Sequence, residues 1–328
     1  MESMMSFASD LKSVSPLTSG CALIGGVVVL LFIKKVAISA YKTFLRPAID
    51  FTKLGKWAVV TGATDGIGKA YAFELAKRGV NVVIISRTES KLEAVKKEID
   101  DKKYGVEVKY VVCDYGKFDT KARDMIAKEL EGLEIGVLIN NVGASYRYPR
   151  YFHELPKEEI QHLLTMNVDS TVWMTEMVLK GMVERKKGAI VNLSSAAARY
   201  TQPLLAEYGA CKSFIEKFSC SLNAEYSGKG ITCQCQAPFF VATKLAKMRK
   251  SWSVPTPEEY CAQGIKWIGY PDDIVSPFWI HATAGWVLLT IPQALTTAHF
   301  TQVLGGLRKR GIAKDANGGV SPQKTKKN

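Results

Sequence analysis

The middle of this 328-residue chain predicts an α/β fold, a doubly wound parallel sheet of the Rossmann type. Continuous runs of Val and Ile alternate there with charged helical segments, and such runs suit strands buried on both faces of a parallel sheet. The first run leads through a glycine-rich turn into a helix, as in a βα unit. A long uncharged stretch nearer the amino terminus adds a membrane anchor to the prediction.

The predicted elements follow one another as strand and helix. Strands are expected from Trp57 onward and at residues 80–86, 106–113, 135–141 and 189–191. Helices are expected at residues 69–78, 89–101 and 117–131. Ligands of such sheets bind beyond the carboxyl ends of the strands. The residues expected at that edge are Gly62, Arg87, Asp114, Asn141 and Ser195.

The glycine-rich turn reads T-G-A-T-D-G-I-G at residues 61–68. Its spacing, G-x-x-x-G-x-G, differs from the common G-x-G-x-x-G fingerprint. Glycines allow a tight turn and let a pyrophosphate approach free N–H groups at a helix amino terminus, where the helix dipole favours anions. The turn therefore predicts a dinucleotide site. The residues expected to form it are Gly62, Thr64, Asp65, Gly66, Ile67 and Gly68.

Three polar residues predict chemistry at a C–O bond. Tyr208 and Lys212 are four apart, so on a helix both side chains share one face. We expect the ammonium group of Lys212 to lower the pKa of the phenol, so that Tyr208 exchanges a proton with a carbonyl oxygen or an alcohol near neutral pH. The hydroxyl of Ser195, thirteen residues before Tyr208, can hold the same oxygen. Ser194 is the alternative serine, but this spacing favours Ser195.

These motifs resemble those of the short-chain dehydrogenase/reductase family, over roughly residues 55–250. The resemblance rests on the glycine-rich turn, on N-N-V-G at 140–143 and on the Ser, Tyr and Lys pattern. A closer likeness is to the microsomal very-long-chain 3-oxoacyl-CoA reductases, also known as type 12 17-beta-hydroxysteroid dehydrogenases. It rests on residues 132–146, 181–190 and 240–250 and on the terminal K-T-K-K-N. The chain departs from the wider family at Val142, usually alanine, and at Pro238-Phe239, often Pro-Gly.

The end of the second predicted strand distinguishes between the two nicotinamide cofactors. An NAD site usually has Asp or Glu there to bind the ribose 2′-hydroxyl, whereas this chain reads Ile85-Ser86-Arg87. A guanidinium can clamp a 2′-phosphate, so NADPH is the predicted cofactor. The resemblance implies the remaining contacts: Asp114 to adenine, Asn141 and Gly143 to the ribose and pyrophosphate channel, Thr243 to the nicotinamide amide, and Tyr208 and Lys212 beside the nicotinamide and its ribose.

The family resemblance implies an enzyme that reduces 3-oxoacyl-CoA to 3-hydroxyacyl-CoA in very-long-chain fatty acid elongation. Tyr208 would protonate the oxygen, Ser195 would hold it, and Asn167 would hold a water that feeds protons to Lys212. The alternative for Asn167 is a polar helix residue bonded to backbone. A reductase of 17-oxosteroids such as estrone is the alternative function. A scaffold without chemistry is disfavoured because both Tyr208 and Lys212 are present.

Partners are predicted partly from the resemblance. It implies a homodimer formed through the helix that bears Tyr208, and contacts with other fatty-acid elongation enzymes. The basic segment 244–250 either meets the phosphates of CoA or is a solvated helix face. The net charge is +13, of which residues 1–56 carry +4 and residues 301–328 carry +6. Basic flanks favour an anionic membrane surface over a nucleic acid as partner.

Cysteine and histidine patterns predict no metal site. The seven cysteines contain no zinc-type C-x2-C pair. Cys233 and Cys235 share one face of a strand, where buried reduced thiols are favoured over a metal or redox pair. The four histidines are scattered and are interpreted as structural or surface groups.

The amino-terminal stretch at residues 17–33 contains no charge and is just long enough to span a bilayer. A cleaved signal peptide is the alternative, but no positive region precedes the stretch and no clear cleavage site follows it. Four basic residues follow it, Lys34, Lys35, Lys42 and Arg46, against Lys12 before it, which places the catalytic domain in the cytosol. K-T-K-K-N resembles an endoplasmic reticulum retrieval signal, so residence in that membrane is predicted.

A second apolar stretch, residues 277–292, is of marginal length for a span and contains His281. A single crossing would hide the lysine motif from the cytosol. The stretch is therefore expected either to lie in or dip into the membrane interface or to form an ordinary core helix. The predicted organisation is an anchor and basic linker (1–50), a catalytic domain (51–270) and a membrane-associated segment with a basic tail (271–328).

Overall fold

The computed structural model describes residues 16–317 and divides the chain into two units, Met1–Pro47 and Ala48–Asn328. In the first unit, α2 (Pro16–Ala40) continues into a π-helical turn, Tyr41–Leu45. Within the described residues, one stretch of helix, Gly20–Leu45, is long and apolar enough to cross a membrane. A helix at the expected anchor is thus confirmed. Lys12 and the lysine motif at 324–328 lie outside the described residues.

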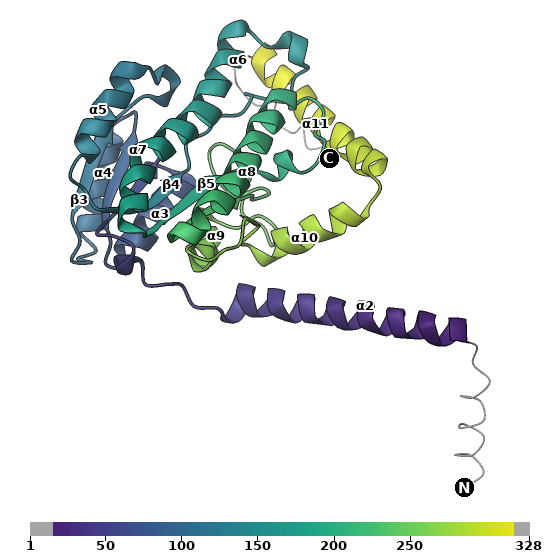
Figure 1. Cartoon of the computed structure of the whole chain (residues 1–328). Coiled ribbons are helices and arrows are strands. Elements are labelled where there is room, and N and C mark those ends of the chain that lie inside the picture. The colour runs from purple at the N-terminus through teal and green to yellow at the C-terminus, as the bar shows by residue number, and fades with distance from the viewer. Residues whose placement is uncertain (1–15, 318–328) are drawn as a thin grey trace. The chain divides into compact units, whose positions relative to one another are not determined.

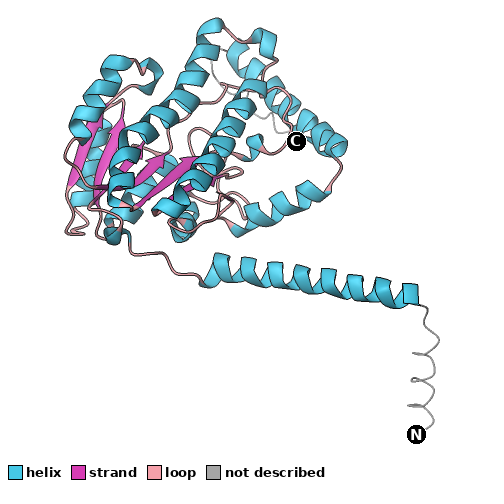
Figure 2. Ribbon diagram, in the orientation of Figure 1, coloured by secondary structure: helices cyan, strands magenta, loops and turns pink. Residues whose placement is uncertain are grey.

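The second unit is built on a seven-stranded sheet in which all neighbouring strands are parallel (Figure 2). The strands are β1 (Trp57–Thr61), β2 (Asn81–Ser86), β3 (Val108–Val112), β4 (Ile135–Asn140), β5 (Gly188–Leu193), β6 (Ile231–Gln236) and β7 (Ile274–Val275). Their order is β3-β2-β1-β4-β5-β6-β7. The winding direction reverses between β1 and β4, so the predicted doubly wound fold is confirmed.

Helices cover both faces of this sheet (Figure 1). The helices on one face are α3 (Gly66–Ala76), α4 (Glu89–Asp100) and α9 (Pro257–Gly264). Those on the other face are α5 (Thr120–Leu130), α7 (Ser170–Arg185) and α8 (Ala206–Tyr226). A shorter helix, α6 (Lys157–Leu164), leads into α7 through a π-helical turn, Thr165–Asp169. This turn carries one of the predicted catalytic residues.

Alternate residues of each central strand contribute to two separate cores. In β1, Val60 belongs to the core that contains Tyr71 of α3, whereas Val59 belongs to the core that contains Met174 of α7. All five residues of β1 and all six residues of β4 are buried. The apolar runs are therefore continuous because both faces are covered, as the sequence predicted.

The predicted strands and helices are confirmed, with shifts at their ends that have local causes. α5 begins at Thr120 rather than at residue 117, because the Asp119 side chain caps it by accepting a hydrogen bond from the Ala122 N–H at 2.9 Å. α3 begins at Gly66, three residues early, because the Asp65 side chain caps it by accepting a hydrogen bond from the N–H of the next residue, Gly66, at 2.8 Å. In both helices the capping aspartate thus determines the first helical residue.

Beyond the sheet, α10 (Trp279–Thr290) and α11 (Gln293–Ala316) complete the unit. β7 extends the sheet past residue 270, the predicted end of the catalytic domain. α11 is fastened to the segment that follows β4 by two hydrogen bonds of 2.6 Å from the Arg308 guanidinium to the Glu154 carboxylate. Arg147 and Asp315 form a second ion pair at 2.6 Å. α10 and α11 therefore lie in the same compact unit as the sheet.

The apolar stretch at 277–292 does not form a core helix. Its helix, α10, has 12 residues, too few to cross a bilayer at about 1.5 Å of rise per residue. Of these residues only His281 is buried, while Trp286 is 50% and Leu289 is 61% exposed. The alternative of an ordinary core helix is therefore wrong, and a position in the membrane interface stays a prediction.

His281 fixes α10 to the loop that follows β6. Its Nδ1 accepts a hydrogen bond from the Phe239 N–H at 3.4 Å, and its Nε2 lies 3.1 Å from the Ser253 carbonyl oxygen. Burial lowers the pKa of His281 to about 4, so the ring stays neutral in the folded protein at physiological pH.

We expect this histidine to make the fold sensitive to acid. Its stabilising effect is complete above pH 6.5 and is lost as the pH falls toward 4, because the unfolded chain then takes up the proton more readily. The loss reaches about 3 kcal/mol. Denaturant unfolding of the full chain in detergent should show this extra pH dependence, and the His281→Gln variant should lack it. Equal pH dependence in both proteins would contradict the assignment.

Candidate active site

The glycine-rich turn joins β1 to α3 and contains two residues with positive φ. These are Gly62, at 64°, and Gly66, at 55°, a backbone region that glycine enters without steric cost. Gly68 is needed for a different reason, because a Cβ there would lie 2.4 Å from the Gly62 carbonyl oxygen and 2.5 Å from Asn141 Nδ2. Ile67 packs against the core. The turn thus presents the α3 amino terminus as a cradle that suits a pyrophosphate.

Asn141 follows β4 and holds this turn in place. Its Nδ2 donates to the carbonyl oxygens of Thr61 and Gly62 at 3.1 and 3.2 Å. Its backbone N–H donates to Thr61 Oγ1 at 3.0 Å. The ends of β1 and β4 are therefore tied together at the point where the winding reverses. A direct contact of Asn141 with a cofactor stays a prediction.

The segment after β6 lies against the same turn. A Cβ at Gly66 would lie 3.1 Å from Thr243 Cγ2. Asp65 caps α3 by accepting a hydrogen bond from the Gly66 N–H at 2.8 Å, and it forms an ion pair with Lys244 at 2.6 Å. The structure thus brings Thr243 to the predicted cofactor edge. The Asp65 carboxylate is used to cap α3 and to pair with Lys244.

The residues after β2 and β3 lie at the same edge and are exposed. Arg87 directly follows β2, and in the described part of the chain no acid pairs with its guanidinium. Thr64 Oγ1 lies 3.0 Å from Ser86 Oγ, which ties the turn to the end of β2. The Asp114 carboxylate accepts a hydrogen bond from the Gly116 N–H at 3.0 Å and remains exposed.

Ser195 and Tyr208 meet in front of the end of β5. Ser195 Oγ accepts a hydrogen bond from the Ala197 N–H at 3.2 Å, so this serine caps the short turn that follows it. Burial raises the pKa of the Tyr208 phenol, while a hydrogen bond with Ser195 lowers it by a smaller amount. The expected fall in the tyrosine pKa is therefore wrong for this structure. The phenol stays protonated at neutral pH and can serve as an acid.

The position of Lys212 explains this outcome. Its Nζ donates to the Leu193 carbonyl oxygen at 3.0 Å and lies 5.9 Å from the centroid of the Tyr208 ring. The side chain is 6% exposed, and burial lowers the pKa of Lys212 to about 8. A charge this far away, and this poorly solvated itself, does not offset the burial of the phenol. Lys212 nevertheless stays mostly protonated at neutral pH.

Asn167 completes the group from the π-helical turn between α6 and α7. Its Nδ2 donates to the carbonyl oxygens of Ala144 and Leu163, both at 2.9 Å, and its Oδ1 accepts from the Ala144 N–H at 3.3 Å. A Cβ at Gly143 would lie 2.9 Å from Asn167 Oδ1 and 3.1 Å from Lys212 Nζ. Asn167 and Lys212 therefore flank the same glycine. Single-turn π-helices are frequent at functional sites.

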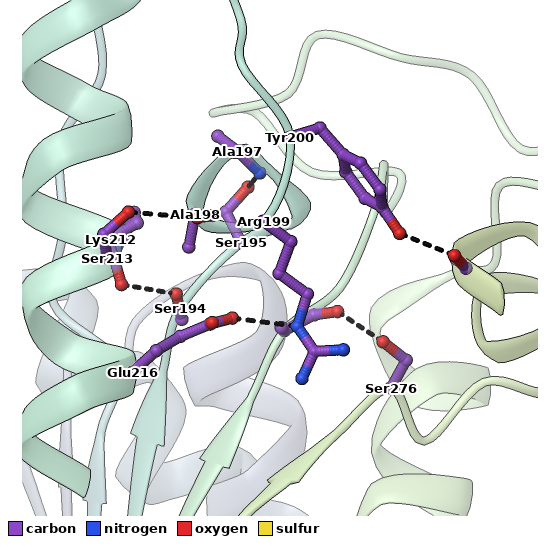
Figure 3. A network of polar contacts seen from close by, with 12 residues as sticks. Ser194, Ser195, Ala197, Ala198, Arg199, Tyr200, Lys212, Ser213, Glu216 and Ser276 are labelled. Atoms are coloured by element: carbon purple, nitrogen blue, oxygen red, sulfur yellow. Dashed lines mark hydrogen bonds and ion pairs between the residues drawn. The ribbon is translucent and has the colours of Figure 1, made fainter. Parts of the chain in front are cut away.

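Ser194, the alternative serine, has a structural role. Its hydroxyl donates to the Lys212 carbonyl oxygen at 2.9 Å and is buried (Figure 3). It thereby ties α8 to the end of β5. Sequence reasoning missed this function and that of Thr61, whose Oγ1 accepts the N–H groups of both Asn141 and Val142. The adjacent serines and the threonine before the glycine turn were the available signals.

The described residues contain no group of three or more His, Cys, Asp or Glu side chains that could hold a metal. Cys233 and Cys235 are free and buried, and burial raises the pKa of the Cys233 thiol to about 12. The interpretation of these residues as inert reduced thiols therefore agrees with the structure. The site has a protonated phenol, a hydroxyl and a buried ammonium beside a nucleotide cradle, which suits proton transfer coupled to hydride transfer.

This fold and site define a class of oxidoreductases. Residues 56–253 match the model of the short chain dehydrogenase family, and the chain belongs to that family. A short-chain dehydrogenase from Sphingobium yanoikuyae, solved in complex with NADPH, is 26% identical and covers 73% of this chain and 97% of its own, with a TM-score of 0.62. The family resemblance predicted from the motifs is thereby confirmed.

Two curated relatives are nearer in sequence. The very-long-chain 3-oxoacyl-CoA reductase of Anas platyrhynchos is 47% identical over 264 residues, which cover 80% of this chain and 84% of the relative. The protein of the same name from Homo sapiens is 46% identical over 243 residues, 73% of this chain and 77% of the relative. The closer likeness to this group of reductases is also confirmed.

Lys212 carries a testable energetic cost. Because its pKa is lowered from 10.5 to about 8, burial of the ammonium destabilises the fold by about 3 kcal/mol below pH 8, and this effect disappears as the pH rises past 10.5. We expect Lys212→Met to be more stable than the parent protein at pH 7 and less so at high pH. Denaturant titrations at several pH values measure it. A variant that is less stable at pH 7 would refute a net cost of burial.

Proposed function

We propose that this protein reduces 3-oxoacyl-CoA to 3-hydroxyacyl-CoA with NADPH during very-long-chain fatty acid elongation. The observation that carries the proposal is the arrangement of Ser195, Tyr208 and Lys212 around the end of β5, in a chain 47% identical to a very-long-chain 3-oxoacyl-CoA reductase. The raised pKa of Tyr208 supports the direction of reaction, because reduction needs a phenol that still holds its proton.

In the proposed mechanism the residues act on the 3-oxo group. When bound, NADPH supplies a hydride to the carbonyl carbon. Tyr208 donates its proton to the carbonyl oxygen, so that the C=O π bond is replaced by one C–H and one O–H bond while the C–O single bond remains. Ser195 donates a hydrogen bond to the same oxygen. The Lys212 ammonium stabilises the phenolate that remains. Asn167 would hold a water that returns a proton through Lys212.

The preference for NADPH is proposed from the edge of the sheet. The glycine cradle fits a pyrophosphate, and the exposed guanidinium of Arg87 stands where an NAD site usually carries a carboxylate. Arg can clamp a phosphate with two parallel hydrogen bonds. Asp114, Gly143 and Thr243 are proposed as the adenine, ribose and nicotinamide contacts.

We further propose that the protein is anchored in the endoplasmic reticulum membrane with its catalytic unit in the cytosol. The apolar helix Gly20–Leu45 supports the anchor, and Lys34, Lys35 and Lys42 favour this orientation. The lysine motif at 324–328 supports the compartment. Residues 271–328 are proposed to be membrane-associated, because α10 exposes Trp and Leu side chains.

A homodimer through α8 and contacts with other elongation enzymes are also proposed. Phe214 on α8 is 44% exposed and stacks on Phe218 with ring centroids 5.8 Å apart. An exposed aromatic pair on a long helix suits a protein interface. The basic segment 244–250 is proposed to meet CoA phosphates, with Arg249 as its free cation among the described residues.

The activity is tested with detergent-solubilised protein, NADPH and a long-chain 3-oxoacyl-CoA, with estrone assayed in parallel. We expect NADPH oxidation with the acyl-CoA, and a loss of about 100-fold or more in Tyr208→Phe, because the proton donor is removed. NADPH binding, followed by fluorescence, should persist in the variant. Turnover of estrone alone would move the protein to the steroid branch, and NADPH binding without turnover of either substrate would favour a scaffold.

The cofactor assignment is tested by Arg87→Leu. Removing a charge-assisted contact worth about 1.5–3 kcal/mol should raise the KM for NADPH about tenfold or more and leave the KM for NADH unchanged. Lys97→Leu serves as the control, because it removes an exposed cation on α4, away from the end of β2. Equal changes for both cofactors, or a similar effect in the control, would speak against a 2′-phosphate clamp at Arg87.

A further inference from the structure

A cavity of about 210 Å³ lies between α10 and the turn that carries the catalytic serine. Its lining comes from four segments of the chain: the turn after Ser195, the loop after β6, the residue after β7, and one face of α10. The aromatic and aliphatic side chains of this lining are Tyr200, Phe239, Trp286 and Leu289. An apolar cavity of about 150 Å³ is large enough to bind benzene, so this space can hold several methylene groups.

One wall of the cavity includes the residue that directly follows Ser195. Ala196, which lines it, directly follows Ser195, and its N–H donates to the Pro238 carbonyl oxygen at 2.8 Å. Phe239 then continues the wall, with its ring 5.9 Å from that of Tyr200. Figure 3 shows Ser195 and Tyr200 on one turn. The cavity therefore begins one residue from the group proposed to hold the carbonyl oxygen.

Most polar groups of the lining already have protein partners. Arg199 Nε donates to the Glu216 carboxylate at 3.2 Å, and the Ser276 hydroxyl donates to the Ala237 carbonyl oxygen at 2.8 Å (Figure 3). The Tyr200 hydroxyl donates to the Gly285 carbonyl oxygen at 2.7 Å. Apart from the two terminal nitrogens of Arg199, the lining therefore offers a ligand mainly apolar surface, which favours an apolar ligand over a polar one.

Another wall of the cavity reaches the exposed surface of α10. Trp286 and Leu289 line the cavity and are also 50% and 61% exposed. Further exposed apolar side chains lie nearby in the sequence, at Val287, Ile291 and Leu295. An apolar chain that leaves the cavity past Trp286 and Leu289 therefore meets more apolar surface.

The space exists because α10 has small residues on its inner face. Gly285 lies in the helix interior, where glycine is less favourable than alanine. A Cβ there would lie 3.2 Å from the Tyr200 hydroxyl and 3.6 Å from the Phe239 ring. Ala282, one turn earlier, lines the same wall. Any larger side chain at Gly285 would project into the cavity.

We propose that this cavity is the acyl-chain subsite, and that Gly285 and Ala282 determine how well the enzyme accepts long chains. The inference rests on the proposed function, since it assigns the tail of the same substrate. The methylenes that directly follow the 3-oxo group occupy the cavity, and the rest of a long chain continues over the exposed face of α10. A short 3-oxoacyl group does not reach the wall at Gly285.

The test compares kcat/KM for acetoacetyl-CoA and for 3-oxopalmitoyl-CoA in the full-length protein in detergent. In Gly285→Leu, kcat/KM for the long substrate should fall roughly tenfold or more, because a hydrophobic pocket rejects even one misplaced methylene by about 10–200-fold. The value for acetoacetyl-CoA should stay unchanged. Gly285→Ala should lie between this variant and the parent protein.

A matched control variant separates occupancy of the cavity from a general effect of the substitution. Gly305→Leu places the same side chain inside α11, where a Cβ at residue 305 would meet nothing within 4 Å. It should leave the ratio of long-chain to short-chain kcat/KM unchanged.

The outcomes distinguish the two hypotheses. If Gly285→Leu lowers kcat/KM equally for both substrates, or for neither, the subsite assignment is overturned while the reductase activity stands. A similar change of the ratio in Gly305→Leu would likewise overturn it. If the parent protein reduces neither acyl-CoA, the proposed function fails and the subsite fails with it.

Discussion

The burial of one charge governs the active-site edge of this protein. Lys212 sits at the end of β5 with 6% exposure, and its ammonium is held by the Leu193 carbonyl oxygen. Solvent cannot stabilise that charge, so its pKa falls to about 8. Protein groups must therefore stabilise the ammonium in place of water. Ser194 contributes indirectly, because its hydroxyl ties the Lys212 backbone to the end of β5. Stability is given up here for a cation that lies 5.9 Å from the centroid of the Tyr208 ring.

Close approach around Gly143 follows from this constraint. A Cβ at residue 143 would lie only 2.9 Å from Asn167 Oδ1 and 3.1 Å from Lys212 Nζ, so no side chain larger than that of glycine fits there. Asn167 reaches this point because the chain makes a π-helical turn between α6 and α7, which changes the direction of one residue without ending the helical path. A glycine after β4 and an irregular turn before α7 thus together place the polar groups. Neither feature would suffice without the other.

The doubly wound parallel sheet and the polar residues at its edge could be predicted from the sequence, because buried parallel strands and a glycine turn leave local patterns. Three features could not. The pKa of Tyr208 depends on burial by segments distant in sequence, and the local Lys212 pattern suggested the opposite direction. The hydrogen bond from the Asn141 side-chain amide to the Gly62 carbonyl oxygen depends on the pairing of β1 with β4. The exposure of α10 depends on what covers it, which its apolar composition does not encode.

A raised tyrosine pKa and a lowered lysine pKa have a joint consequence for the direction of catalysis. Burial raises the pKa of the phenol above 10.0 and lowers that of the ammonium from 10.5 to about 8, so the ammonium becomes clearly the stronger acid of the two. Transfer of a proton from the ammonium to a phenolate, through a short relay, is then downhill. The Tyr208 phenol is neutral before the reaction, and the Lys212 ammonium supports its negative charge after it has given up the proton. This pair therefore stabilises the transition state, in which the carbonyl oxygen gains negative charge, more than the ground state. This asymmetry favours a site that reduces carbonyl groups.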